Sequence, residues 1–136
     1  MSLVSGWTDA ESTVFTKLIN ATGSEAGVNA FLGALPQEMV NMWALDSGGG
    51  SADIANGNCW GSEDYNATIS GVFTSREGAQ VFCGQVKQLL ATAPKNFNGV
   101  GNVQWFRPVG NPQLVQDLED QVTLLEWSFE LIFNNV

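Results

Sequence analysis

The sequence predicts an α+β fold: a single domain over residues 1–136, in which a mostly antiparallel four-stranded sheet carries two main helices packed on one face. The length of 136 residues is that of about one domain, and 44% hydrophobic residues suffice for a core. Helical and strand-like periodicities follow one another without the strict alternation that produces parallel doubly wound sheets. Only 14% of the residues are charged, which argues against disorder.

The first helix is expected over residues 8–22. Thr8 and Glu11 have the spacing of a capping box, and apolar residues then recur every three or four positions. Gly23 suits a C-terminal cap. A short second helical turn is expected over residues 24–35, so the first third of the chain is predicted to be helical.

Two strands separated by a long loop are expected next. Residues 39–45 alternate apolar side chains on both faces, which predicts a strand that is partly covered on each side. The glycine-rich composition of residues 46–65 predicts a long loop. Residues 66–74 are expected to form the second strand, in which Gly71 marks a bulge or a close backbone approach.

The second half of the chain contains the clearest periodicities. A helix is expected over residues 75–93, with Ser75 as its N-cap and one continuous apolar stripe. Residues 103–107 predict a short strand stopped by Pro108. Residues 125–133 alternate apolar and polar side chains and predict an amphipathic strand.

The charge balance narrows the classes of partner. Fourteen acidic residues against five basic ones give a formal net charge of −9, which largely excludes binding to nucleic acid by charge. Residues 1–30 contain only one basic residue, Lys17, so no secretory signal is expected. The apolar stretch at 123–133 is broken by acidic and polar side chains, so no membrane association is expected.

The cysteines and the motifs offer little chemistry. Cys59 and Cys83 are expected to be reduced thiols, with a structural disulfide as the alternative, and without histidine the chain lacks the usual partners for zinc. Residues 99–102 begin like a dinucleotide fingerprint but lack its third glycine. The adjacent Glu63 and Asp64 should point in opposite directions. No catalytic, metal-binding or cofactor-binding residue is therefore expected, and no cofactor.

Several residues are candidates for contact with a neighbour. Glu126 and Glu130 share one face of the last predicted strand; they are expected to form the wet face of the sheet or, in an oligomeric ring, to line a channel or meet a basic residue. Arg76 and Arg107 could pair with such acids, since arginine forks onto carboxylates, or could remain free at the surface. Trp60 is either a clip onto the core or an anchor for a partner.

A third group of candidates is acidic. It comprises Asp117, Glu119 and Asp120. These residues are expected to form a solvated turn between strands; as alternatives they could contact a partner or bind Mg²⁺ or Ca²⁺.

The order of the elements resembles a known family. The resemblance is carried by Trp60-Gly61 and the strand that follows it, by residues 71–79 leading into an amphipathic helix, by the strand at residues 102–109 with Pro108, and by the amphipathic C-terminal strand. In these features the chain is similar to the tail-terminator proteins of long-tailed bacteriophages, also described as minor tail proteins of the lambda type.

The resemblance implies a structural virion protein and not an enzyme. Such a protein would form a homo-oligomeric ring, hexameric in this family, on the last ring of the tail tube, end tube polymerisation and present the surface that joins the head. Its partners would be the tail-tube protein on one side and a neck or connector protein on the other, with DNA passing through without specific binding. It would reside in the virion at the head-tail junction after assembly in the bacterial cytoplasm. Acids such as Glu126, Glu130 or the 117–120 cluster would then repel DNA from the ring lining.

Three alternatives remain open at the level of sequence. A neck or head-completion protein, or another small tail component, would share the size and often the fold. A small-ligand or carbohydrate-binding module would use tryptophan and the Asn/Gly-rich loops. An enzyme with an unfamiliar carboxylate site is the third.

Overall fold

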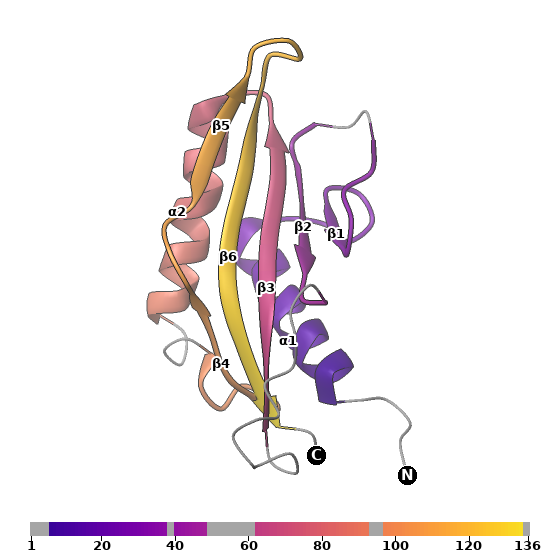
Figure 1. The fold of residues 1–136 in the computed structure, drawn as a ribbon, viewed down its shortest axis with the longest axis vertical. Coiled ribbons are helices and arrows are strands. Elements are labelled where there is room, and N and C mark those ends of the chain that lie inside the picture. Colours follow the sequence, from indigo (N-terminus) through magenta and orange to yellow (C-terminus); the bar gives the residue numbers. More distant parts are fainter. Residues whose placement is uncertain (1–5, 38–39, 49–61, 93–96, 135–136) are drawn as a thin grey trace.

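The computed structural model describes residues 6–37, 40–48, 62–92 and 97–134. Two helices and six strands follow one another along the chain, which confirms the α+β class (Figure 1). The elements are α1 (Gly6–Thr22), β1 (Ala30–Leu32), β2 (Met42–Asp46), β3 (Ser62–Phe73), α2 (Arg76–Thr92), β4 (Val103–Pro108), β5 (Gln113–Asp117) and β6 (Val122–Asn134).

All six strands belong to one sheet. Its order is β1-β2-β3-β6-β4, and β5 also pairs with β6. The pairing of β1 with β2 is parallel and every other pairing is antiparallel. The long strands β3 and β6 form the centre. Because β4 pairs with the second half of β6 and β5 with its first half, β4 and β5 follow each other along one edge.

The prediction of four strands is wrong, because β1 and β5 were not foreseen. β1 lies where a helical turn was expected. There, Gly27 and Gly33 have φ angles of +81° and +91°, outside the helical range, and Phe31 pairs with Ala44 instead. β5 is a five-residue strand with a mixed polar sequence, held in place by its pairing with β6 and by Leu114, which packs against the core.

The remaining expected elements are confirmed with shifted ends. α2 begins as expected, since the Gly78 N–H donates to the Ser75 Oγ at 3.0 Å, which is the hydrogen bond of an N-cap. β3 begins at Ser62, within the segment expected to be loop. Much of that loop, residues 49–61, lies outside the described residues.

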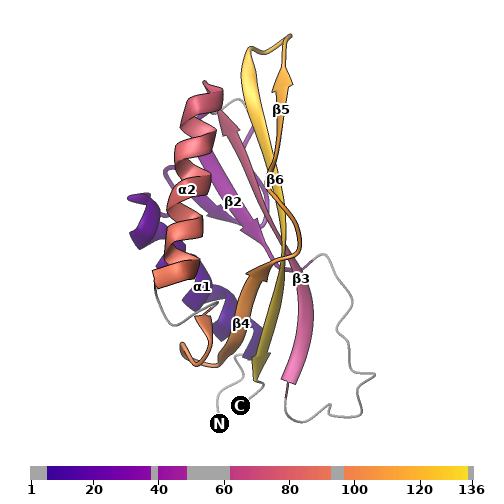
Figure 2. The ribbon, with the colours of Figure 1, turned by 90° about the vertical axis from the view of Figure 1, so that its left-hand side faces the viewer.

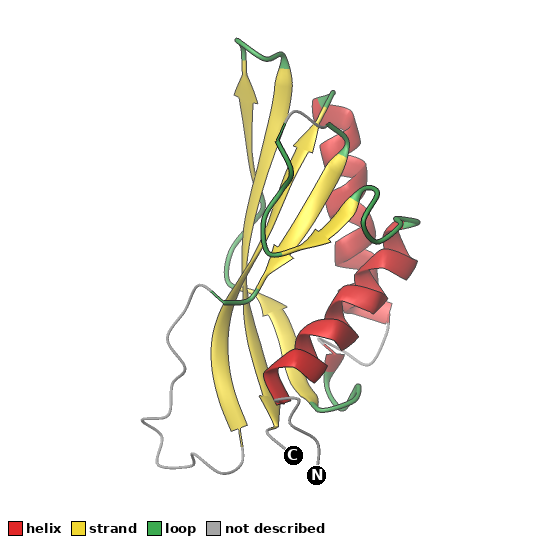
Figure 3. Cartoon of the chain, turned by 90° about the vertical axis from the view of Figure 1, so that its right-hand side faces the viewer, coloured by secondary structure: helices red, strands yellow, loops and turns green. Residues whose placement is uncertain are grey.

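Both helices lie on the same side of the sheet (Figures 2 and 3). Aromatic side chains fill the core between the helices and the sheet. The rings of Phe106 and Phe129 stack with their centroids 4.5 Å apart, and the ring centroids of Trp43 and Phe15 are 5.5 Å apart. The prediction that only one face of the sheet is covered is nevertheless inexact, because the side chains of β2 are buried on both faces. Its four residues 42–45 are each at most 2% exposed. The expectation of a strand covered on both sides is thus confirmed for β2.

Candidate partner-binding surface

The face of β3, β5 and β6 that points away from the helices is called the outer face here. It arises from the period-two pattern of β6, whose side chains alternate between the helix side and the outer face. Phe129 on the helix side is fully buried, whereas Glu126 and Ser128 are exposed. The expected division of this strand into an apolar row and an acidic row is therefore confirmed, with Glu126 and Glu130 on the outer face.

Glu130 does not stand alone on this face. Its Oε1 accepts hydrogen bonds from Arg107, at 2.8 Å from Nε and 2.6 Å from Nη2. The two residues are direct neighbours across β4 and β6. The Arg107 guanidinium also lies 4.6 Å from the ring centre of Trp105, within the range of a cation–π interaction. The arginine that was expected to be free or to reach a neighbour's acid is thus paired within its own chain.

Two shallow depressions adjoin each other on the outer face. The first, of about 360 Å³, lies between β5 and the β3–β6 centre, with Leu35, Val72, Val115 and Leu124 among its lining residues. The second, of about 270 Å³, follows the β4–β5 connection. Gln113 and Glu126 line both depressions. They therefore form one continuous groove, here called the outer groove.

Apolar side chains are exposed in and beside the outer groove. Val109, Val115 and Leu124 line it and are 67%, 60% and 38% exposed. Leu118, in the turn between β5 and β6, is 79% exposed. Sequence reasoning missed these residues, because β5 was not recognised. The alternation of Gln113, Val115 and Asp117 with Leu114 and Gln116 is the signal that could have found them.

The turn between β5 and β6 contains the predicted acidic cluster. Asp117 Oδ1 accepts the backbone N–H groups of Glu119 at 3.0 Å and Asp120 at 3.3 Å. An aspartate whose side chain accepts the amides two and three residues further along the chain forms an Asx turn. The expected turn between two strands is thus confirmed. Among the described residues, no group of three or more acidic, Cys or His side chains is arranged to hold a metal ion.

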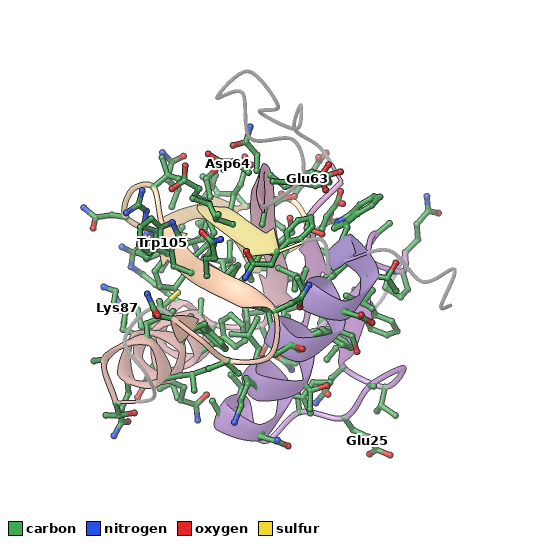
Figure 4. All side chains as sticks on the ribbon, turned by 90° about the horizontal axis from the view of Figure 1, so that it is seen from below. Glu25, Glu63, Asp64, Lys87 and Trp105 are labelled. Carbon is green, nitrogen blue, oxygen red and sulfur yellow. The ribbon has the colours of Figure 1, made fainter. Side chains whose placement is uncertain are left out.

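The structure does not bring the other candidate residues to the outer groove. Arg76 is exposed at the start of α2, in the helix layer. Trp60 lies outside the described residues. Glu63 and Asp64 project to opposite faces of β3, as expected, and Figure 4 shows them on either side of that strand.

A buried polar network connects α1 to the end of β2. Ser47 is fully buried; its Oγ accepts the Trp7 Nε1–H at 2.8 Å and donates to the Glu11 carboxylate. A serine beside a carboxylate resembles part of a hydrolase site, but this hydroxyl has no exposed surface. The network therefore fastens the helix to the sheet, and Glu11 serves this contact instead of the predicted capping box.

Residues 99–102 do not form a nucleotide site. Gly99 and Gly101 have positive φ angles, and the Val103 N–H donates to the carbonyl of Val100 at 3.0 Å. This turn leads into β4, whereas a dinucleotide fingerprint leads into a helix.

Neither α1 nor α2 combines the length and the hydropathy that a membrane-crossing helix needs.

Cys83 is a buried free thiol on α2, and burial raises its pKa, an effect that Lys87 partly offsets. Burial and the nearby Glu63 likewise raise the pKa of Tyr65. Cys59 lies outside the described residues. A raised pKa means that the folded protein holds the proton more tightly than the unfolded chain. Both groups thus stabilise the fold below their ordinary pKa values, and this contribution is lost as the pH rises through the raised ones.

The burial of Cys83 predicts a difference in thiol reactivity between the folded and the unfolded protein, and this difference can be measured. In a Cys59→Ser variant, native Cys83 should react with iodoacetamide at pH 8 at least about tenfold more slowly than in urea, because the reactive thiolate is rare and inaccessible. The free energy of unfolding should also be lower at pH 10 than at pH 7. Equal rates of alkylation in the native and unfolded states would contradict the buried position.

Comparison with known proteins adds no relative. The chain matches no protein-family model and no curated protein.

Proposed function

We propose that the chain is a structural virion assembly protein that forms a ring, six copies in this proposal, on the end of a phage tail tube. There it ends tube polymerisation and forms the surface that joins the head. It acts at the head-tail junction, after assembly in the bacterial cytoplasm, between the tail-tube protein and a neck or connector protein. The resemblance of the element order to tail terminators supports this proposal, and the surface of the sheet supports it independently.

The observation that carries the proposal is the exposed apolar surface along β5 and β6. Val109, Val115, Leu118 and Leu124 lie on or beside one groove, on the face that the helices leave uncovered. Contiguous apolar surface of this kind marks an interaction site on a protein. A subunit that is completed by neighbours in an assembly accounts for it.

Free strand edges give further support. Within the described part of the chain, β4 and β5 each pair with one strand only, and β1 pairs with β2 and, through Ala30, with Ala26, so the remaining backbone groups along these edges can pair with a further strand. Proteins that remain monomeric usually protect such edges. Here one edge lies at β1 and the other at β4 and β5, on opposite sides of the sheet, which suits head-to-tail contacts in a closed ring.

The proposed lining of a channel by Glu126 and Glu130 stays a prediction. Arg107 neutralises Glu130, so Glu126 would supply more of any repulsion toward DNA. Replacing both acids by Lys should then slow DNA ejection. Unchanged ejection would contradict a lining role for these residues.

Tube length is the measurement that tests the proposal. The cognate tail-tube protein is polymerised with and without this chain, and tube lengths and ends are recorded by negative-stain electron microscopy. The added protein should shorten the tubes and leave a distinct ring at one end. An acidic protein of similar size that is unrelated to phage tails serves as the control for crowding and charge. Tubes of unchanged length without an end ring would contradict the proposal.

A further inference from the structure

The outer groove is a surface without an assigned occupant. The helix layer lies on the other side of the sheet (Figure 3), and the groove follows β5 and the first half of β6. In its first depression, the walls are mainly apolar side chains of β3, β5, β6 and the segment before β2, whereas the second depression is lined mainly by polar residues. An extended peptide that lies along this groove would bury Val115 and Leu124, two of the exposed apolar residues.

The charge of the groove is negative. Among the described residues, Glu126 is the only ionisable one that lines either depression, and it is exposed. The nearest cation in the pairing register, Arg107, already binds Glu130. Glu126 therefore offers a carboxylate at the junction of the two depressions, between the apolar side chains of the first and the mainly polar lining of the second.

The sheet that carries the groove is negative as a whole. The sheet and its β5–β6 turn carry eight described acids against the single cation Arg107. The acids are Asp46, Glu63, Asp64, Asp117, Glu119, Asp120, Glu126 and Glu130. The helices carry three of the four described cations: Lys17, Arg76 and Lys87. This charge distribution favours a cationic occupant over an acidic one, because like charges brought together at an interface cost several kcal/mol.

We propose that the outer groove binds a cationic, apolar segment of a partner chain, with Glu126 pairing with its Lys or Arg and with Val115 and Leu124 covering its apolar side chains. The inference rests on the proposed assembly function and names the chemistry of the partner that the assembly surface recognises. Where it holds, Glu126 contacts that partner and does not line a channel. The proposed contacts between copies in the ring lie at the free strand edges and leave this groove to a partner of another kind.

Binding of model peptides tests the charge and the apolar requirement separately. The full-length ¹⁵N-labelled protein is titrated with three blocked heptapeptides: one alternating Lys and Val, one alternating Glu and Val, and one alternating Lys and Ser. The Lys/Val peptide should bind and shift the amide signals of β5 and of residues 122–126. The other two should bind at least about tenfold more weakly, because each lacks one of the two complementary features.

Variants of the groove identify the residues that are responsible. Glu126→Lys should weaken the Lys/Val peptide about fivefold and strengthen the Glu/Val peptide, since the ion pair is replaced by repulsion in one case and created in the other. Glu25→Lys makes the same change in net charge at an exposed position on the other side of the molecule, where Figure 4 shows it far from Asp64, and should leave both affinities unchanged.

A second matched pair tests the apolar wall. Val115→Ser should weaken the Lys/Val peptide about fivefold to tenfold, because a valine side chain loses its burial in the complex. Val81→Ser removes a valine of similar exposure, 56% against 60%, from the outer surface of α2 and should have no effect. Circular dichroism spectra identical to the wild type establish that each variant is folded.

Three results would overturn the proposal. One is the absence of binding by the Lys/Val peptide, and another is equal weakening by Glu126→Lys and Glu25→Lys. The third is self-association of the chain in sedimentation equilibrium that Val115→Ser abolishes, since a second copy would then occupy the groove. Failure of the proposed function is distinguishable: if the peptide binds in the groove but tubes are not capped, the groove inference stands and the terminator proposal falls.

Discussion

Replacing Trp43 by Ala is expected to reduce the free energy of unfolding by about 3–5 kcal/mol, the loss typical of a buried Trp or Phe truncated to Ala. Trp43 is 2% exposed and packs between Phe15 and Phe82, with both ring centres 5.5 Å away. Its Nε1–H also donates to the Ser24 Oγ at 2.9 Å, which fixes the chain after α1 to β2. The substitution removes a contact to both helices at once.

Urea unfolding followed by far-UV circular dichroism measures this loss. Trp43→Phe separates its parts, because the ring volume is largely retained while the hydrogen bond to Ser24 is lost; about 1–2 kcal/mol is expected. Val81→Ala, at an exposed position on α2, should change stability by no more than about 0.5 kcal/mol. A loss below about 1.5 kcal/mol for Trp43→Ala would show that the two helices do not depend on this side chain.

Replacing Gly71 by Ala is expected to destabilise the fold by about 1–3 kcal/mol, the cost of overpacking a dense core. A Cβ at this position would lie 2.5 Å from Phe73 Cε2 and 3.3 Å from the carbonyl oxygen of Met42. The Phe73 ring has little room to retreat, since it is 7% exposed and lies 5.5 Å from the ring of Phe82. The close approach predicted for this glycine is thus confirmed.

Gly84→Ala is the matched control and should have the opposite sign. An added Cβ at Gly84 meets no atom within 4 Å, and the residue lies in the middle of α2. Alanine there should stabilise the protein by about 0.5–1 kcal/mol, because glycine is entropically costly inside a helix. Thermal unfolding of both variants gives the comparison. Equal stability of Gly71→Ala and wild type would show that Phe73 and its neighbours can rearrange at little cost.

The parts of the fold that were predictable are those in which a helical or strand period is kept over many residues. The apolar stripe of α2 and the alternation of β6 each extend over many residues, so burial of one face specifies the element. β1 and β5 carry no comparable signal. β1 has three residues and β5 has one inward apolar side chain, Leu114, so their conformation depends on pairing with the next strands along the chain, β2 and β6, and not on a pattern of their own.

The candidate surface was predictable only in part. The alternation of β6 placed Glu126 and Glu130 on one face correctly. Their different surroundings follow from the register of two other strands: β4 brings Arg107 beside Glu130, and β5 brings Gln113 beside Glu126. The sequence of β6 holds no information about either partner. The outer groove therefore becomes visible only when the register is known.

The pairing of β3 with β6 has a consequence for how the chain folds. Ser62 pairs with Asn134 and Phe73 with Thr123, so every partner in this central pair is at least 50 positions away along the chain. Closing so large a loop costs entropy before any contact is gained, and proteins dominated by such distant contacts fold slowly. On the ribosome, β2 and β3 can pair with each other early, but the pairing of β3 with β6 must wait for the synthesis of β6. The centre of the sheet is thus completed only after all the other strands have been made.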